Sequence, residues 1–416
     1  MHKALVTLLF AIAAAGISGQ DRPVVAVVGD LPRVQEMKRQ LVKLYTVVDV
    51  PVKGLPVFPP SGVAYREDGE AHRVWRELHV IAPDAVVMLS DYPGLVEALR
   101  GKVPVTRGAP FDRPKKSLLR LDMEERLGRT PRQVLEQLGA VYGRELKEVV
   151  YIPAFAVMGQ LALGNRELVD RLVAPYLDGR QDSLAKATGS HGSGHLLFAA
   201  LGKTERVRAA AALIAPLHNE MSDSVFMACP ILGAAGEHEK AIAHLRFMEK
   251  QCLREDGIYR HSPLDETAWG RGNAFALLGQ ALLLETMAKP DARVLDSFRA
   301  LATALLNKQD GRGMWHQVID RPESYAEFSA TAMIAASYKK GIRAGWLDAK
   351  TFQPAVEAAW RAVLARTGTD GTVMDVCEST GKQKSLAAYM ERAAIWGQDP
   401  RGGTMAMLLA GEMMKP

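Results

Sequence analysis

A glycine-rich segment in the second half of the chain, Asp265–Asn273, places a tryptophan and an arginine close together. The face of the Trp269 indole can stack on a sugar ring, and the guanidinium of Arg271 can hold a carboxylate through two hydrogen bonds. Together, these side chains are suited to binding an acidic sugar. A buried tryptophan and a structural ion pair would explain the same two residues equally well.

The glycines on either side of Arg271 determine the local structure that we predict. Glycine inside a helix costs about 1 kcal/mol relative to alanine. We therefore expect an extended loop over Trp269–Gly272, followed by a helix that begins at Ala274 with Asn273 as its N-cap. Such a loop would let the tryptophan, the arginine and backbone N–H groups converge on one ligand.

Asp223 directly precedes an almost wholly apolar stretch that includes Val225, Phe226 and Met227. An aspartate at a helix start ordinarily caps the helix or interacts favourably with its dipole. The alternative is a partly desolvated carboxyl group that holds a proton near neutral pH and donates it as a general acid. The apolar neighbours are compatible with this second role, and the residues alone leave both roles open.

Three other polar positions are candidates for a cleft. His261 follows a turn and can reach a cleft, although a lone histidine more often lies at the surface or supports another group. Ser190–His195 is a polar, glycine-containing segment that we expect to be flexible, and it contains His191 and His195. No acidic third ligand stands near these histidines, so we predict no metal site. Glu327 completes a Ser-x-x-Glu pattern typical of a capping box, which predicts a structural role.

Helical periodicity dominates from about residue 118 to the C-terminus. Asp-Gly turn signals begin at Asp256, Asp310 and Asp370, at intervals of about 50 to 60 residues, which suits one helical hairpin per interval. We therefore predict six hairpins forming an (α/α)6 toroid over residues 117–416, with the turns at one edge of the ring. An open solenoid would have the same periodicity and stays as an alternative.

Residues 21–116 have a different character. Strand-like runs at Val24–Val28, Tyr45–Val50 and Asp84–Leu89 alternate with helical patterns, which predicts a small parallel βαβ lobe that ends in a linker. No Gly-x-Gly-x-x-Gly follows the first strand, so we expect no dinucleotide site there. We interpret the lobe as an accessory unit.

Residues 1–20 are typical of a secretory signal peptide, with Lys3 before an apolar run and small residues after it. We expect export to the periplasm or beyond, with an uncleaved anchor as the alternative. The composition is that of an ordinary globular protein, since 48% of the 416 residues are hydrophobic and the net charge is +5. No basic tract suggests nucleic-acid binding, and the three cysteines lack the spacing of a zinc site or a disulfide framework.

Five blocks of the helical part occur together in a recognisable order. They are Asp223–Pro230, Tyr259–His261, Trp269–Asn273, Gly313–Gln317 and Glu327–Met333. In this order they resemble glycoside hydrolase families 88 and 105, the unsaturated uronyl and rhamnogalacturonyl hydrolases, and the third block matches the family's Trp-Gly-Arg-Gly-Asn without a change. The resemblance extends from about residue 131 to the C-terminus and leaves the N-terminal lobe outside.

The resemblance implies a toroid that hydrolyses oligosaccharides ending in an unsaturated uronic acid, without metal or cofactor. By resemblance, Asp223 protonates C4 of the C4=C5 double bond and water adds at C5. The resulting hemiketal opens, and the glycosidic bond breaks without attack at C1, unlike hydrolysis by two carboxylates. His261, Trp269 and Arg271 would contact the unsaturated sugar, with Met227 packed nearby.

Two stretches depart from the family pattern. The family has a second acidic residue shortly before the helix that we expect at His195, and this chain has Ser190 and His191 there. The segment before Asp223 is also short, with only His218–Met221 remaining. Because both lie on the substrate side, one alternative is a hydrolase of saturated uronides in which His191 or another cleft residue replaces the acid. The other is a carbohydrate-binding relative without activity.

Overall fold

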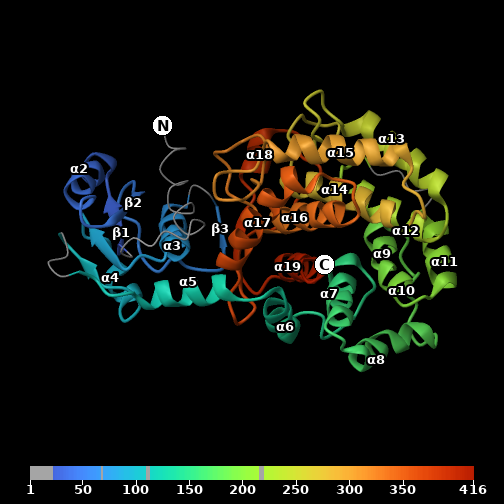
Figure 1. The fold of residues 1–416 in the computed structure, drawn as a ribbon, viewed down its shortest axis with the longest axis horizontal. Helices are drawn as coiled ribbons and strands as arrows, with labels where there is room; N and C mark the ends of the chain where they lie inside the picture. Colours follow the sequence, from blue (N-terminus) through green and yellow to red (C-terminus); the bar gives the residue numbers. More distant parts are fainter. Residues whose placement is uncertain (1–21, 67–68, 109–112, 215–219) are drawn as a thin grey trace. The chain divides into compact units, whose positions relative to one another are not determined.

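The chain folds as two compact units. The computed structural model describes residues 22–66, 69–108, 113–214 and 220–416, so the predicted signal peptide over residues 1–20 lies outside the described residues. The first unit ends at Gly128 and the second comprises Arg129–Pro416, whereas the sequence analysis placed the division after residue 116 (Figure 1). Among the described residues, no helix is long and apolar enough to cross a membrane.

The first unit is built around a parallel sheet with strand order β2-β1-β4-β5. Its strands are β1 (Val24–Gly29), β2 (Thr46–Pro51), β4 (Ala85–Met88) and β5 (Val105–Thr106), and a short strand, β3 (Ala64–Tyr65), lies outside this sheet. Its helices are α2 (Leu31–Leu41), α3 (Glu70–Ile81), α4 (Leu95–Leu99) and α5 (Leu118–Gly128). The three predicted strands and the parallel βαβ lobe are confirmed.

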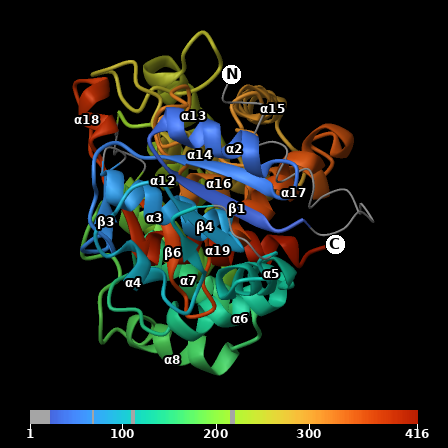
Figure 2. The same ribbon diagram turned by 90° about the vertical axis from the view of Figure 1, so that its left-hand side faces the viewer.

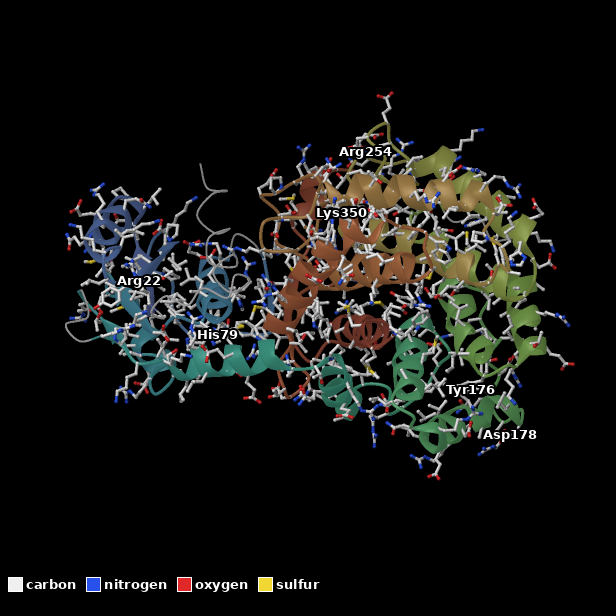
Figure 3. All side chains as sticks on the ribbon, in the orientation of Figure 1. Arg22, His79, Tyr176, Asp178, Arg254 and Lys350 are labelled. Atoms are coloured by element: carbon white, nitrogen blue, oxygen red, sulfur yellow. The ribbon has the colours of Figure 1, made fainter. Side chains whose placement is uncertain are left out.

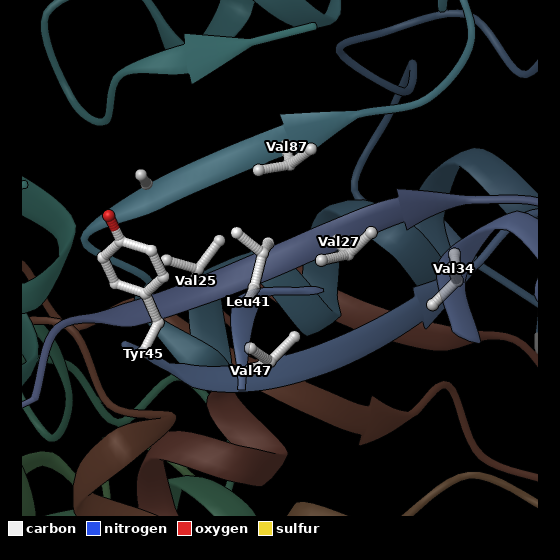
Figure 4. Close-up of a cluster of buried hydrophobic side chains, with 8 residues drawn as sticks. Val25, Val27, Val34, Leu41, Tyr45, Val47 and Val87 are labelled. Carbon is white, nitrogen blue, oxygen red and sulfur yellow. The ribbon is translucent and has the colours of Figure 1, made fainter. Parts of the chain in front are cut away.

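The core of this lobe lies between β1 and α2. Every residue of β1 is buried, as expected for a central parallel strand that pairs on both sides, with β4 beside it in Figure 2. Val25 and Val27 lie on the same face of β1 and pack with Val34 and Leu41 of α2 and with Val47 of β2 (Figure 4). The period of two along β1 therefore fixes which face the helix covers.

Six helices of the second unit form a closed inner ring. In ring order they are α7 (Tyr151–Ala162), α9 (Gly189–Gly194), α12 (Ser224–Ala234), α14 (Gly270–Glu285), α16 (Phe328–Arg343) and α19 (Pro400–Met413). Each helix packs against the next, and α19 packs back against α7 (Figure 1). This closure confirms the toroid and excludes the open solenoid.

Outer helices surround the ring. They are α6 (Pro131–Val141), α8 (Arg166–Leu177), α11 (Thr204–Ile214), α13 (His238–Cys252), α15 (Ala292–Leu306) and α17 (Ala349–Ala365), and a short helix, α10 (Leu196–Ala200), precedes α11. The inner helices α12 and α14 are buried along almost their whole length, whereas α15 buries one face, as its polar and apolar spacing requires. Tyr176 anchors the end of α8 by donating to the carbonyl of Leu146, 3.0 Å away (Figure 3).

The Asp-Gly turns lie where the sequence predicted. Asp256, Asp310 and Asp370 follow the outer helices α13, α15 and α17, so all three stand at the edge of the ring where an inner helix begins. The sequence did not indicate the feature after the last turn. An antiparallel hairpin of β6 (Val373–Cys377) and β7 (Ala394–Gly397) encloses a short helix, α18 (Leu386–Met390).

Candidate active site

The first turns of the inner helices meet on one face of the ring. The Tyr151 ring at the start of α7 contacts Phe226 of α12 and Phe275 of α14, with ring centroids 5.7 and 5.5 Å apart. Thr404, the fifth residue of α19, donates to the carbonyl of Ile152 in α7, 3.3 Å away. Because a helix carries a partial positive charge of about +0.5 at its N-terminus, this face favours an anionic ligand.

Asp223 lies at the N-cap position of α12, but its side chain accepts no hydrogen bond from that helix. Its Oδ2 atom is instead 3.0 Å from Nε2 of His261. Its Oδ1 atom has no hydrogen-bond partner among the described residues and is not among the fully enclosed polar atoms, while the residue as a whole is 9% exposed. The structure therefore does not support the capping role and leaves one carboxylate oxygen free at the face of the ring.

His261 stands behind Asp223 and does not reach solvent. Its side chain is fully buried, and its Nδ1 atom is 2.8 Å from the hydroxyl of Tyr389 in α18. The imidazole also packs against the Trp269 ring at a centroid distance of 4.7 Å. The family resemblance predicts that His261 contacts the substrate, whereas this geometry lets it act on Asp223 from the protein side.

Trp269 is only 1% exposed, so it does not present the open face that sugar stacking requires. Its ring packs against the imidazole of His261 and also against the guanidinium of Arg271, whose Cζ is 5.4 Å from the ring centroid. Trp269 is therefore a buried structural residue, which is the alternative that the sequence left open.

Arg271 is 3% exposed and is anchored through two of its nitrogens. Nε donates to the Ser329 hydroxyl at 2.8 Å, and Nη2 donates to Glu327 at 3.4 Å and to the carbonyl of Cys377. Burial alone would lower the pKa of Arg271, but the charge of Glu327 raises it overall. Nη1 has no hydrogen-bond partner in the described part of the chain and is not fully enclosed, so it is the nitrogen left to meet an anion.

The predicted loop over Trp269–Gly272 is wrong, because α14 already begins at Gly270. A Cβ atom at Gly270 would lie 2.3 Å from the carbonyl oxygen of His316, and one at Gly272 would lie 2.4 Å from the Ser222 hydroxyl. The glycines therefore allow neighbouring segments to pack closely against the start of α14 and do not provide an extended backbone. Asn273 is not an N-cap either, since its amide bonds the backbone N–H and carbonyl of Tyr259 instead.

Met227 borders the same face from α12 and is 9% exposed. Its sulfur lies 3.3 Å from the hydroxyl of Ser193, and a Cβ atom at Gly189 would lie 2.9 Å from the Met227 Cβ. Met227 thus joins α12 to α9 beside Asp223, and its packing near a bound sugar stays a prediction.

His191 belongs to helix α9, and the flexible loop predicted for Ser190–His195 is wrong. Thr188 caps this helix by accepting the His191 N–H, and the ring nitrogens of His191 lie 2.6 Å from the Thr188 hydroxyl and 2.9 Å from Glu148. The hydrogen bond from His191 is the main cause that lowers the pKa of Glu148 to about 2. The described residues contain no group of three or more His, Cys, Asp and Glu side chains arranged to hold a metal ion.

Glu327 is structural, as the capping pattern predicted, but it caps by a different route. It is itself the N-cap of α16, whose first residue is Phe328, and its carboxylate accepts the Ala330 N–H. The same carboxylate accepts from the Ser329 hydroxyl at 2.8 Å and from the Cys377 N–H at 2.9 Å. It is fully buried and fixes Arg271 from the far side.

Sequence reasoning missed Tyr389 and Tyr151. Tyr389 is 1% exposed in a helix of five residues, and 128 positions separate it from His261 in the chain, so neither periodicity nor spacing could pair them. Tyr151 is partly exposed at the start of α7, and burial raises the pKa of its hydroxyl. A tyrosine opening an inner helix is the one signal that could have indicated its position.

A surface hollow of about 450 Å³ borders this site without containing Asp223. It is lined by Arg254, Asp265, Glu266, Thr267, Asp320, Arg321 and Leu386, and Arg254 is marked in Figure 3. Arg254 bonds Asp320 at 2.8 Å, so opposite charges in the hollow already neutralise each other. We therefore centre the candidate site on Asp223.

Part of the helical unit is similar to a known protein family. The model of Glycosyl Hydrolase Family 88 matches residues 218–416. The chain is related to glycoside hydrolase family 88. An unsaturated rhamnogalacturonyl hydrolase of Bacillus subtilis is 33% identical over 137 residues, which are 31% of this chain and 38% of that protein. An unsaturated 3S-rhamnoglycuronyl hydrolase of Formosa agariphila is 27% identical over 224 residues, which are 46% and 57% of the two chains.

The relationship to family 88 confirms the resemblance predicted from the five sequence blocks. The chain spans only about half the length of these two curated relatives, or less. A solved structure of a possible family 105 member from Salmonella enterica has a TM-score of 0.59 and 17% identity, over 68% of this chain and 93% of that one. At this identity the match shows the fold, and it confirms the toroid.

Proposed function

We propose that the helical unit hydrolyses oligosaccharides that end in a 4,5-unsaturated uronic acid, with Asp223 as the proton donor. One observation carries the proposal: Asp223 is nearly buried, with one carboxylate oxygen held by His261 and the other free. A partly desolvated carboxyl group with one free oxygen is suited to donating and then accepting a proton. The names of the two relatives, both hydrolases of unsaturated sugars, support the substrate class.

The reaction that suits a single carboxyl group is hydration of the double bond. Asp223 donates its proton to C4, and positive charge develops at C5 and the ring oxygen. A water molecule attacks C5 and returns one proton to the Asp223 carboxylate, so one water is added and the acid is regenerated. The hemiketal at C5 then opens the ring, and the hemiacetal left at C1 breaks down and releases the neighbouring sugar as an alcohol.

The substrate carboxylate is the second element of the proposal. Nη1 of Arg271 faces no protein partner among the described residues, while Glu327 and Ser329 fix the rest of the guanidinium in place. The first turns of α7, α12, α14, α16 and α19 add partial positive charge at the same face. We infer that this field and Nη1 hold the uronate in the orientation that presents C4 to Asp223.

The test is a spectrophotometric assay of lyase-generated disaccharides, in which hydration removes the ultraviolet absorbance of the conjugated double bond. We expect the wild-type protein to remove it, and Asp223→Asn to lower kcat by about 10² to 10⁴-fold, the usual contribution of general acid–base catalysis. Asp296→Asn is the matched control, because Asp296 is exposed on the outer helix α15.

Two outcomes would contradict the proposal. Cleavage of saturated uronides, with no loss of absorbance on any unsaturated substrate, would indicate the alternative hydrolase. Binding of both kinds without turnover would indicate a carbohydrate-binding protein. Circular dichroism of each variant shows whether a loss of activity comes from unfolding.

A further inference from the structure

The hydroxyl group of Tyr389 interacts with the backbone of Gln383 and with the side chains of His261 and Ser262. It lies 3.2 Å from the backbone nitrogen of Gln383, and 2.8 Å from Nδ1 of His261. A backbone N–H can only donate, so the phenol oxygen accepts from Gln383. The Ser262 hydroxyl can donate to the same oxygen, which leaves the single hydroxyl proton of Tyr389 to be donated to Nδ1.

The opposite nitrogen of the ring meets an acceptor. Nε2 of His261 lies 3.0 Å from Oδ2 of Asp223, and an ionised carboxylate can only accept. With Tyr389 as the donor, both ends of the imidazole are satisfied by the same neutral tautomer, in which Nδ1 accepts and Nε2 carries the proton. The ring is fully buried and packed against Trp269, so it cannot flip without opening this cluster.

We propose that Tyr389 is a positioning residue that keeps the His261 proton on Nε2 and so places the proton of Asp223 on its free oxygen. This inference deepens the proposed function and rests on it for the part that concerns catalysis. With Oδ2 occupied by the Nε2–H donor, a protonated Asp223 carries its own proton on Oδ1, the oxygen without a protein partner.

The other tautomer would misplace that proton. If Nδ1 carried the hydrogen, Nε2 would become an acceptor, and the Asp223 proton would move to Oδ2 and point at the histidine. The carboxyl group would then have no proton to offer at the face of the ring. Tyr389 is 1% exposed, so it acts through His261 and not by contact with the substrate.

The same tautomer helps after the proton has left. Once Asp223 has given its proton to C4, the Nε2–H···Oδ2 hydrogen bond joins a donor to a full negative charge, and such bonds are about twice as strong as neutral ones. The arrangement therefore stabilises the carboxylate at the moment it forms. A histidine held by Tyr389 needs no reorganisation to provide this bond.

The experiment compares wild type with Tyr389→Phe, which removes only the hydroxyl group. Nitrogen-15 NMR of histidine-labelled protein reports which ring nitrogen carries the proton, and His261→Gln identifies the His261 signals. We expect Nε2 protonation in wild type and a mixture of tautomers in Tyr389→Phe. We also expect kcat to fall about tenfold or more, with KM changed by less than about twofold. The reason is that enzyme molecules with the other His261 tautomer bind the substrate but do not protonate it.

Tyr338→Phe is the control for a purely structural effect. Tyr338 is fully buried on α16, and its hydroxyl donates to a carbonyl, that of Ala302, at 2.8 Å. It should lose stability to a similar degree, while kcat and the His261 spectrum stay unchanged. A control that lowers kcat as much as Tyr389→Phe would overturn the positioning role.

The spectrum also separates this inference from the proposed function. Nδ1 protonation of His261 in wild type, or unchanged Nε2 protonation in Tyr389→Phe, overturns the role of Tyr389 even if the enzyme hydrates unsaturated uronides. Conversely, the expected spectra in a protein that acts on no unsaturated substrate would support the hydrogen-bond geometry and refute the proposed reaction, and with it the catalytic part of this inference.

Discussion

Replacing Glu327 with glutamine tests how the N-terminus of α14 is held in place. The substitution keeps the shape of the side chain and removes its negative charge. Both carboxylate oxygens of Glu327 face donors only: Oε1 accepts from Arg271, the Cys377 N–H and the Ser329 hydroxyl, and Oε2 accepts from the Ala330 N–H and the same hydroxyl. Whichever way the new amide turns, its NH₂ group therefore opposes a backbone or guanidinium donor.

The expected cost follows from burial. Glu327 is fully buried and Arg271 is 3% exposed, so the substitution leaves a guanidinium charge without its partner inside the protein. Breaking a buried pair on one side destabilises a protein by about 3 to 5 kcal/mol, which is a large part of the 5 to 15 kcal/mol of a typical folded protein. The Glu327→Gln variant should still fold, but close to its stability limit.

Urea unfolding, followed by circular dichroism of the helical signal, measures this effect. With an m-value of about 3 kcal/mol per molar, the midpoint should fall by about 1 to 1.7 M. Glu136→Gln is the control, since Glu136 pairs with Arg132 on the exposed face of α6 and surface pairs contribute about 0 to 1 kcal/mol. If the Glu327→Gln midpoint moved no further than that of Glu136→Gln, the buried pair would not anchor α14 as we argue.

Two further predictions concern the packing of the ring. Burial alone would raise the pKa of Glu412, but the charge of Lys340 lowers it to about 2 from the ordinary value of 4.5. The ionised Glu412 therefore stabilises the fold by about 3 kcal/mol, an effect fully present above pH 4.5 and lost as the pH falls through 2. The urea midpoint of Glu412→Gln should accordingly decrease less steeply with falling pH than that of wild type. Equal decreases would refute the assignment. Gly272→Ala should destabilise by about 1 to 3 kcal/mol and slow the reaction, because its Cβ would lie 2.4 Å from the Ser222 hydroxyl and 3.4 Å from Oδ2 of Asp223. Gly411→Ala on α19 has its nearest neighbour at 3.9 Å and should be neutral or stabilising in the same unfolding and activity measurements.

The architecture could be predicted because it depends on local periodicity. Helix spacing and the turns at Asp256, Asp310 and Asp370 indicated hairpins, and the lobe's apolar runs indicated a parallel sheet. Closure of the ring could not be predicted in this way, because it depends on α19 packing against α7 across most of the second unit. The hairpin of β6 and β7 was missed since it lies among helices and its strands are short.

The site was predicted less completely, and for a physical reason. Asp223 and Arg271 could be proposed because a carboxyl and a guanidinium group have recognisable chemistry wherever they lie. Their partners, Tyr389 and Cys377, are brought to them only by the fold, through contacts with no local signal. The glycines beside Arg271 were misread as loop residues, because the same residue type that permits an extended backbone also permits a neighbouring segment to approach a helix closely.

The buried state of the Trp269–Asn273 block changes what the block contributes to function. Trp269, Arg271 and Asn273 form most of their contacts with the protein, so they hold the start of α14 against α16 and against the turn that carries His261. Among the described residues, Oδ1 of Asp223 and Nη1 of Arg271 lack hydrogen-bond partners without being enclosed, whereas Nε1 of Trp269 lacks one but is fully enclosed. If substrate binds through the two atoms that are not enclosed, the block acts mainly by fixing their separation, and substitutions behind them should lower kcat through misplacement even where no atom touches the sugar.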